Sequence, residues 1–446
     1  MLLLRRIEDR FLLAPLVFGF LLSVVGAEYI PPGPKYTCPE KVKLFYPCVC
    51  TRGTDDGLFI SCENSNLASL SVAFINLANL NVPIEELHLR RCKIRNLFGT
   101  LLHKLSVKRL YVAETPLASI SDHVFYGIND TLQELHLEGS ELTSFPSGAF
   151  KILGMLKVLN IDGHRIESLP KGIFTGMTFD ATLEKFHFVN GLLNDMGPEV
   201  FMSFKKIKTL DIHGNQLVSL KKGQFKGLRE AEILDLSFNN ITKLDASHVS
   251  DLTKMTWINV SHNALTEITR GTFARNAVLR VLNMAFNSIK KIDANTFRGM
   301  RFLRRLYLND NMISDVGRGT FGSVTRIGTI DLARNRIKKV DYQMFFQLNY
   351  AEIINLAENE IIEIQKDAFK DLYLTHINIS YNRLETIEPK SFINCANMTV
   401  LDLSHNLIKS IPRTAFDETT YASEWILTHN LLTNMSQIPL ANMTGL

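Results

Sequence analysis

Hydrophobic residues recur at a fixed spacing through most of the chain, from Ile84 onward. The repeating pattern is LxxLxLxxNxLxxLxxxxFxxL, which residues 207–228 show most completely. Its Leu-x-Leu segment is typical of a short strand that points its leucines inward and the residue between them outward. Because every unit contains such a strand, the pattern predicts one parallel sheet of stacked strands.

The asparagine of this pattern sets the repeat length. It recurs with a period of 24 residues, broken once by 23, at Asn215, Asn239, Asn263, Asn287, Asn311, Asn335, Asn359, Asn382, Asn406 and Asn430. Five earlier units carry another residue in its place: Cys92, Thr115, Ser140, His164 and Gly191. Together they make fifteen repeats of about 24 residues. The 27-residue spacing from His164 to Gly191 predicts a local bulge or a longer loop.

Two residue types have structural roles in the repeat. The asparagine amide can bond the unpaired backbone groups of its own and the neighbouring coil. Phenylalanines should fill the opposite, convex wall, at positions 125, 150, 174, 201, 225, 273, 297, 321, 345, 369, 392 and 416.

The pattern is the leucine-rich-repeat signature. It predicts an α/β solenoid, a horseshoe of about 15 repeats with a concave parallel β-sheet.

The first 27 residues predict a secretory signal peptide. Basic residues precede the apolar run 11–25, which ends at small residues that fit cleavage after Ala27. An uncleaved anchor helix is the alternative, but Pro15 and the Pro-rich segment 31–34 favour cleavage. No other stretch reaches the roughly 18 apolar residues that span a bilayer. We therefore expect a secreted chain with no transmembrane segment after cleavage.

Four cysteines cluster behind the signal segment, at Cys38, Cys48, Cys50 and Cys62. In an oxidising compartment they predict two disulfides, with three connectivities open. A zinc site is the alternative, but CxxC pairs and neighbouring histidines are missing. Residues 55–57 predict a β-hairpin between the last two cysteines. Cys92 and Cys395 are expected to be buried thiols.

With this cysteine cluster ahead of 24-residue repeats, the chain resembles secreted and cell-surface leucine-rich-repeat proteins with an N-terminal cysteine cap. Within that family, residues 48–53 (CVCTRG) and 56–64 (DGLFISCEN) look like the artichoke and chaoptin-like proteins of insects. The resemblance implies an N-terminal disulfide cap in which Cys38 pairs with Cys50 and Cys48 pairs with Cys62. It also implies a non-enzymatic role in the matrix, in adhesion or in a receptor.

These features divide the chain into three parts: a signal peptide (1–27), a linker with the N-terminal cysteine cap (28–66), and the repeat solenoid (67–446). Each coil of a solenoid buries its faces only against its neighbours, so the terminal coils need caps. No closing cysteine cluster follows the last repeat. We therefore expect a fragment of a longer protein.

The net charge of +4 hides an uneven distribution. Residues 270–340 contain fifteen Lys and Arg and four Asp and Glu, a local balance of +11. We expect an acidic glycan or an acidic protein surface to bind seven basic residues there: Arg280, Lys290, Lys291, Arg304, Arg305, Lys338 and Lys339. The alternative is that these are solvated surface charges without a partner.

The concave face of a solenoid is its usual binding surface. Six residues should line up on it across three successive strands: Ile233, Phe238, Trp257, His262, Val281 and Phe286. Exposed aromatic residues grouped in this way can anchor a protein partner. Alternatively, they cover one another and contribute only to stability.

Seven N-x-S/T sequons predict N-linked glycans on an exported protein: Asn129, Asn240, Asn259, Asn378, Asn397, Asn434 and Asn442. Asn259 and Asn378 lie between the leucines of their strands and should face outward on the concave sheet. Glycans at these two positions would obstruct the concave surface.

The sequence favours recognition over catalysis. It contains no HExxH, no GxSxG and no close pair of buried carboxylates, so we expect no enzyme activity, metal or cofactor. We expect a role in recognition, adhesion or scaffolding with extracellular proteins, and no nucleic-acid partner because the chain is exported. One alternative is the ligand-binding ectodomain of a Toll-like or other leucine-rich-repeat signalling receptor whose membrane segment is missing. A purely structural matrix element is another.

Overall fold

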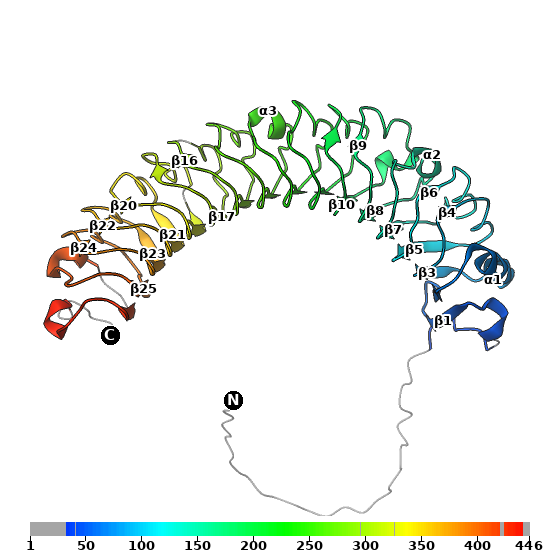
Figure 1. The fold of residues 1–446 in the computed structure, drawn as a ribbon, viewed down its shortest axis with the longest axis horizontal. Helices are drawn as coiled ribbons and strands as arrows, with labels where there is room; N and C mark the ends of the chain where they lie inside the picture. The colour runs from blue at the N-terminus through cyan, green and yellow to red at the C-terminus, as the bar shows by residue number, and fades with distance from the viewer. Residues whose placement is uncertain (1–32, 41, 295, 325, 420–422, 440–446) are drawn as a thin grey trace, which may run out of the picture. The chain divides into compact units, whose positions relative to one another are not determined.

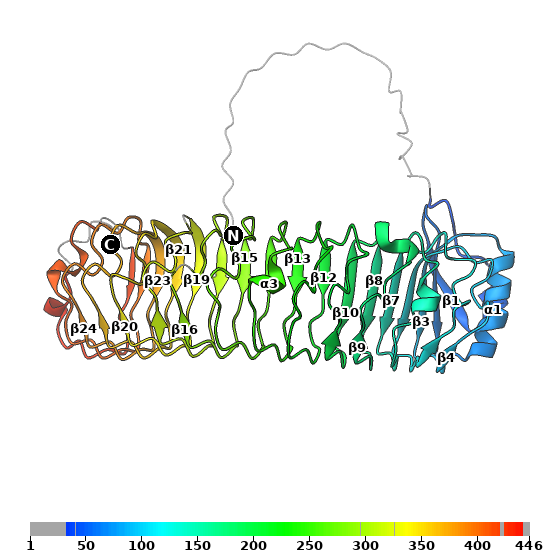
Figure 2. The ribbon, with the colours of Figure 1, turned by 90° about the horizontal axis from the view of Figure 1, so that it is seen from above.

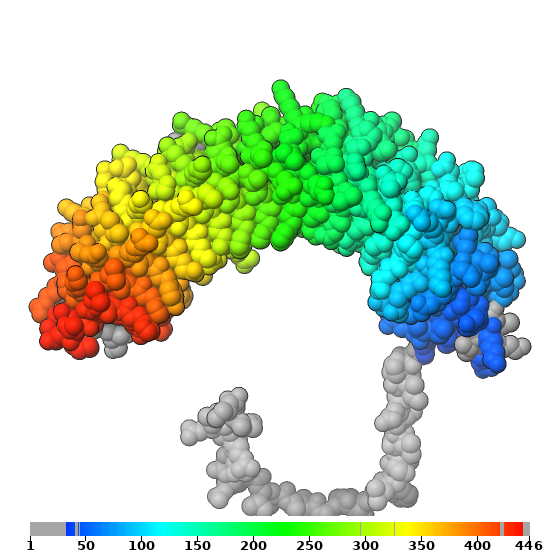
Figure 3. Space-filling model, in the orientation of Figure 1, coloured from blue at the N-terminus to red at the C-terminus, as the bar shows by residue number. Residues whose placement is uncertain are grey.

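A computed structural model describes residues 33–40, 42–294, 296–324, 326–419 and 423–439. The expected signal peptide and the sequon at Asn442 lie outside these residues. Lys35–Leu446 forms one compact unit. Within it, the described coils stack into a continuous curved solenoid (Figure 1 and Figure 3).

The inner, concave side of the solenoid is one large sheet. It begins with two antiparallel strands, β1 (Cys48–Gly53) and β2 (Leu58–Glu63). Fifteen parallel strands follow in the described part of the chain: β3 (Ile84–Arg90), β5 (Val107–Ala113), β7 (Glu134–Glu138), β8 (Val158–Asp162), β10 (Lys185–Val189), β12 (Thr209–Asp211), β13 (Ile233–Asp235), β14 (Trp257–Asn259), β15 (Val281–Asn283), β17 (Arg305–Tyr307), β19 (Ile327–Asp331), β21 (Tyr350–Asn355), β23 (Tyr373–Asn378), β25 (Val400–Asp402) and β26 (Glu424–Ile426). Equivalent repeat positions pair, so Leu234 lies between Leu210 and Ile258. The predicted leucine-rich horseshoe is confirmed.

Shorter strands lie outside this sheet, toward the convex side (Figure 1), and line one edge when the solenoid is seen from above (Figure 2). They form separate small parallel sheets: β4 (Asn96–Leu97) with β6 (Ser119–Ile120), β9 (Ser168–Leu169) with β11 (Asp195–Met196), β16 (Lys291–Ile292) with β18 (Asp315–Val316), and β20 (Lys339–Val340) with β22 (Glu363–Ile364) and β24 (Thr386–Ile387). Short helices also occur between the strands, among them α2 (Ser147–Phe150), α3 (Ala246–Val249), and the 3-10 helices η3 (Arg413–Phe416) and η4 (Met435–Gln437).

Phenylalanine forms the convex wall, as predicted. All twelve positions are buried. From Phe297 to Phe416, six rings at successive repeats stack with centroid separations of 6.0, 5.7, 5.4, 4.9 and 4.9 Å. The column is interrupted where Val249, at the end of α3, takes the phenylalanine position. Each buried ring contributes roughly 1.5–3 kcal/mol of transfer free energy, so the column stabilises the coil–coil interfaces that it spans.

The repeat asparagines form a hydrogen-bonded ladder. Nδ2 of Asn287 donates to the carbonyls of Val260 in the preceding coil (3.0 Å) and of Met284 and Ala285 in its own (3.1 Å each). Its Oδ1 accepts from the backbone N–H of Leu265 at 3.0 Å. One buried amide therefore satisfies backbone groups at a turn where sheet bonding stops.

Cysteine and threonine replace asparagine in the first two coils. The Cys92 thiol lies 3.6 Å from the carbonyl oxygens of Cys62 and Arg90. The Thr115 hydroxyl donates to the carbonyl of Ala113 at 3.0 Å and accepts from the backbone N–H of Cys92 at 3.1 Å. These side chains partly reproduce the amide bonds. Cys92 is buried, as expected.

In the two irregular coils, His164 and Gly191 hold the position of the repeat asparagine. The buried ring of His164 accepts from the backbone N–H of Ile166 at its Nδ1 (3.2 Å), while its Nε2 has no partner in the described structure. A Cβ atom on Gly191 would lie 2.2 Å from Cε1 of that ring. The imidazole therefore occupies the space of two ladder side chains, and glycine is required at the next coil. Burial lowers the pKa of His164 to about 4.

The expected longer connection between these coils is present and folded. Its additional residues form the 3-10 helix η2 (Thr178–Ala181), and Phe179 of this helix is buried in the core. The concave sheet is not disturbed, because Phe186 of β10 stays in register with Leu159 of β8 and Leu210 of β12.

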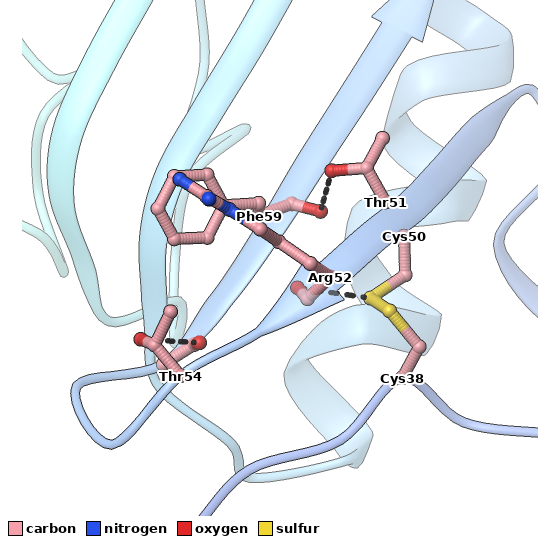
Figure 4. The surroundings of a disulfide bond; sticks show 7 residues. Cys38, Cys50, Thr51, Arg52, Thr54 and Phe59 are labelled. Carbon is pink, nitrogen blue, oxygen red and sulfur yellow. Dashed lines mark hydrogen bonds between the residues drawn. A yellow bond between two sulfur atoms is a disulfide. The ribbon is translucent and has the colours of Figure 1, made fainter. Parts of the chain in front are cut away.

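The N-terminal cap contains the two disulfides. One joins Cys38 to Cys50 (Figure 4), and the other joins Cys48 to Cys62. This is the pairing that the family resemblance implied. Cys48 and Cys62 lie opposite each other on β1 and β2, which form the predicted hairpin.

Two contacts connect β1 and β2 of this hairpin. The guanidinium of Arg52 lies over the ring of Phe59, 3.9 Å from its centroid, and the Thr51 hydroxyl donates to the Phe59 carbonyl at 3.3 Å (Figure 4). The 3-10 helix η1 (Val42–Phe45) and the helix α1 (Leu67–Asn79) complete the cap.

Candidate functional site

The six residues predicted to bind a partner lie together on the concave side. Ile233, Trp257 and Val281 are direct neighbours on β13, β14 and β15. Phe238, His262 and Phe286 follow shortly after these strands, and their rings stack with centroid distances of 4.1 and 4.2 Å. We call these six residues the aromatic surface. Phe238 is 55% exposed and Phe286 is 44% exposed.

The backbone at these three rings is in the left-handed region. Phe238, His262 and Phe286 have φ angles of 53°, 53° and 54°. Gly139 and Gly163 hold the same position in earlier coils. A side chain in this conformation costs about 1–2 kcal/mol, while a ring stack returns about 0.5–1.5 kcal/mol. Other coils place charged residues at this left-handed position, among them Glu114, Asp310 and Glu358, so the backbone does not require large exposed rings there.

The sequon at Asn259 lies in the middle of the aromatic surface. Its Oδ1 accepts from the backbone N–H of Ser261 at 3.1 Å, and its Nδ2 donates to Asp235 Oδ2 at 3.2 Å. The side chain is half-buried. Both ends of this amide are thus engaged in local bonds of the concave sheet.

The other described sequons differ in exposure. Asn240 and Asn434 are exposed, whereas Asn129, Asn378 and Asn397 are half-buried. Asn378 repeats the arrangement of Asn259 by accepting from the backbone N–H of Ser380 at 2.9 Å. The geometry therefore favours attachment of a glycan at Asn240 and Asn434.

The seven predicted basic residues do not form one patch. Arg280, Arg304 and Arg305 lie at or just before strands of the concave sheet, which the repeat brings side by side. The remaining four lie in or directly before β16 and β20, which belong to the separate small sheets: Lys290, Lys291, Lys338 and Lys339. The structure thus divides the seven into an arginine group and two lysine pairs.

The lysine pairs are partly neutralised. Nζ of Lys291 lies 3.1 Å from Asp293 and 3.6 Å from Asp315, and Nζ of Lys339 lies 3.3 Å from Asp341. Arg280 and Arg305 have no acidic partner in the described part of the chain. The Arg304 side chain donates to the carbonyl of Arg326 at 2.7 Å.

Two further ring stacks are present in the described structure. One joins His88, Tyr111 and His136 on β3, β5 and β7, with centroid distances of 4.5 and 4.4 Å. The other joins Tyr381, His405 and His429, with distances of 4.1 Å each. Alignment of the repeats places the members of each stack at one position, so this signal was available in the sequence.

A cluster of histidines and carboxylates was also missed. Asp211 on β12 contacts ring nitrogens of His187 (3.2 Å) and His213 (2.8 Å), and it is paired with Asp235 on β13. Burial alone would raise the pKa of Asp211, but the hydrogen bonds from the two histidines hold it below its usual value.

Comparison with known proteins shows the family. The model of the leucine-rich repeat matches residues 181–241, 205–265, 229–289, 253–313, 278–327, 325–382 and 373–432. These segments run from 181 to 432, more than half of the chain. The chain belongs to the leucine-rich-repeat proteins.

Several characterised leucine-rich-repeat proteins are similar in sequence. Podocan-like protein 1 of Mus musculus is 25% identical over 184 residues, which cover 39% of this chain and 32% of the relative. Lumican of Coturnix japonica is 28% identical over 147 residues, covering 31% and 39%. Toll-like receptor 4 of Bos taurus is 23% identical over 228 residues, covering 45% and 26%. The chain thus spans about a third of the length of these relatives.

Solved leucine-rich-repeat structures share the fold. The structure of TLR13 in complex with ssRNA13 superposes with a TM-score of 0.69 at 19% identity, covering 84% of this chain and 54% of that one. Drosophila Toll, in its complex with Spatzle, superposes with a TM-score of 0.60 at 21% identity, covering 79% and 50%. Among the described residues of this chain, no helix has the length and apolar character needed to cross a membrane.

Proposed function

We propose that this leucine-rich-repeat protein is an extracellular recognition protein whose concave aromatic surface binds a protein partner. The observation that carries the proposal is the exposure of Phe238 and Phe286, whose rings stack on His262 at left-handed backbone positions that follow β13, β14 and β15. Rigid aromatic side chains contribute much of the energy in protein interfaces, because they bury a large area with little loss of conformational entropy.

Other features support an extracellular location. The cap contains two disulfides, which persist in oxidising compartments. The signal segment, cleaved after Ala27, would export the chain, and the sequons would carry glycans. A role in matrix adhesion or scaffolding agrees with the resemblance to the insect artichoke and chaoptin-like proteins. Sequencing the N-terminus of the secreted chain tests the cleavage site.

Substitution of the two exposed phenylalanines tests the aromatic surface. The secreted full chain carrying Phe238→Ala and Phe286→Ala is compared with wild type in quantitative capture of extracellular proteins. The matched control carries Tyr381→Ala and His405→Ala, which removes a ring stack of the same geometry elsewhere on the concave side. We expect a partner retained by wild type and control but reduced at least about ten-fold by the phenylalanine variant, since hot-spot truncations cost about 2 kcal/mol or more.

Two results would contradict the aromatic surface. One is an identical set of captured proteins for wild type and both variants. The other is complete glycan occupancy of Asn259 by mass spectrometry of the secreted protein, because a glycan in the middle of the surface would block it.

The second candidate function is the ligand-binding ectodomain of a signalling receptor. It is favoured by the similarity to Toll-like receptor 4. Toll and TLR13 are described in complexes with Spatzle and with single-stranded RNA, whereas for this exported chain we propose a protein ligand. Sequencing the transcript past Leu446 separates the candidates: a membrane helix with a cytoplasmic domain supports the receptor, and a closing cap supports a secreted protein.

A further inference from the structure

Two neighbouring carboxylates on the concave side have histidines, and no Lys or Arg, as basic neighbours in the described structure. Asp211 and Asp235 are paired across β12 and β13, and in the described structure neither contacts a Lys or Arg. Like charges directly opposite on a sheet are destabilising. The groups around them are the imidazoles of His187 and His213, the amide of Asn259 and the hydroxyl of Ser237, which donates to Asp235 Oδ1 at 2.6 Å.

The structural role of these residues does not require a negative charge. Asp211 and Asp235 accept from the backbone N–H two residues further on, at 3.1 and 2.8 Å. Asn259 and Asn283 make the same bond at 3.1 and 3.0 Å in the next two coils. Asparagine is therefore sufficient for this turn. Asp211 and Asp235 differ from the other aspartates that make the same bond, Asp331 and Asp402, because they are on successive strands and lie beside two histidines.

We propose that Asp211, His213 and Asp235 bind a divalent transition-metal ion of the zinc class on the concave surface. One ligand atom from each of the three lies within 4.8 Å of the others. Tetrahedral zinc, with bonds of about 2.0–2.1 Å, holds its ligand atoms about 3.3 Å apart, so small side-chain rotations bring them into place. His187, at 3.2 Å from Asp211, acts as a positioning residue.

The ligand set selects the kind of metal. One imidazole with two carboxylates suits zinc and its neighbours in the transition series, whereas calcium takes six to eight oxygen ligands. Three protein ligands leave a fourth position open. The side chains of Asp211 and His213 are 18% and 34% exposed, so this position faces the solvent on the concave side.

The inference was not available from motifs. We expected no metal site, because the sequence contains no HExxH and no close pair of buried carboxylates. The repeat period of 24 residues brings Asp235 beside Asp211. This inference is independent of the proposed function.

Metal titration of the untagged, EDTA-treated full chain tests the site. We expect one high-affinity zinc ion per chain by isothermal titration calorimetry, and a tetrahedral cobalt spectrum. Asp211→Asn, Asp235→Asn and His213→Gln should each lower the zinc affinity by at least about ten-fold, and His187→Gln by about ten-fold. Both Asp→Asn variants keep the turn bond that Asn259 makes, so they separate metal binding from folding.

The matched control is Asp331→Asn. Asp331 caps the same turn by accepting from the backbone N–H of Ala333 at 3.0 Å, but no histidine contacts it in the described structure. The zinc affinity of the Asp331→Asn variant should stay within about two-fold of wild type. Unchanged zinc affinity in Asp211→Asn and Asp235→Asn, displacement of zinc by calcium, or loss of binding only upon substitution of His405 and His429 would each overturn the proposal.

Discussion

At the residue scale, His164 takes the position of the repeat asparagine in its coil but satisfies fewer hydrogen bonds than the asparagine does. Its ring fills the place of two ladder side chains and packs on Phe188, with 3.8 Å between ring centroids. It bonds only one backbone N–H, and its Nε2 has no partner in the described structure. A buried imidazole in this position is stable only while it is neutral.

This leads to a prediction about acid stability. The pKa of His164 is about 4 in the folded chain against an ordinary value of 6.5. Below about pH 6.5 the unfolded chain binds a proton that the folded chain excludes until about pH 4. Within this window stability should fall by up to about 1.4 kcal/mol per pH unit. His164→Asn should remove this contribution.

Urea unfolding of wild type and His164→Asn at pH 7 and pH 5 measures the effect. Wild type should lose about 2 kcal/mol more than the variant between the two pH values. The contribution of His164 is absent above about pH 6.5, so differences at pH 7 report packing alone. Equal pH dependence of the two proteins would show that His164 does not titrate in this window.

At the element scale, the convex wall depends on a column of phenylalanine rings rather than on helices. The helix α3 has only four residues and ends at Val249, where the column is interrupted. Phe345 stands inside the column, 5.7 Å from Phe321 and 5.4 Å from Phe369, while the adjacent Phe346 is 38% exposed. Two neighbouring residues of the same type thus have different environments.

Alanine substitution of Phe345 and of Phe346 should distinguish the effect of packing in the convex wall from the effect of losing a phenylalanine as such. Phe345→Ala should lower the free energy of unfolding by about 3–5 kcal/mol, because it removes buried contacts with two coils and leaves a cavity. Phe346→Ala should cost less than about 1 kcal/mol, since it removes only an exposed ring and its contact with Arg318. Urea unfolding checks both, and equal effects would contradict a continuous column.

Strands, ladder and wall could be predicted because each depends on a local repeat of hydrophobic or polar residues. The disulfide pairing needed the family resemblance, since spacing left three connectivities. The cluster at Asp211 and the stack at Tyr111 were missed because their members belong to different coils and match no local motif, so only an alignment of the repeats brings them together. Charge along the sequence was also misleading: Arg280 and Lys290 are ten residues apart, yet one precedes a concave strand and the other follows the turn.

At the scale of the whole molecule, the solenoid places the basic residues of one sequence segment on different surfaces. The segment 270–340 carries a balance of +11, but acidic partners engage Lys291 and Lys339 on the small sheets. Arg305 lies on the concave sheet, and in the described structure no carboxylate pairs with it. We propose that an acidic glycan or protein surface contacts the arginine group more strongly than the lysine pairs.

Chromatography on immobilised heparin tests this difference. Arg304→Glu with Arg305→Glu and Lys338→Glu with Lys339→Glu change the net charge equally, from +4 to 0. Long-range attraction alone would therefore lower the eluting salt concentration to the same extent in both. We expect a clearly larger reduction for the arginine variant, because one of the two charges that the lysine variant alters, that of Lys339, already pairs with Asp341. Equal reductions, or no retention of wild type at low salt, would show that the arginines do not form an anion-binding surface.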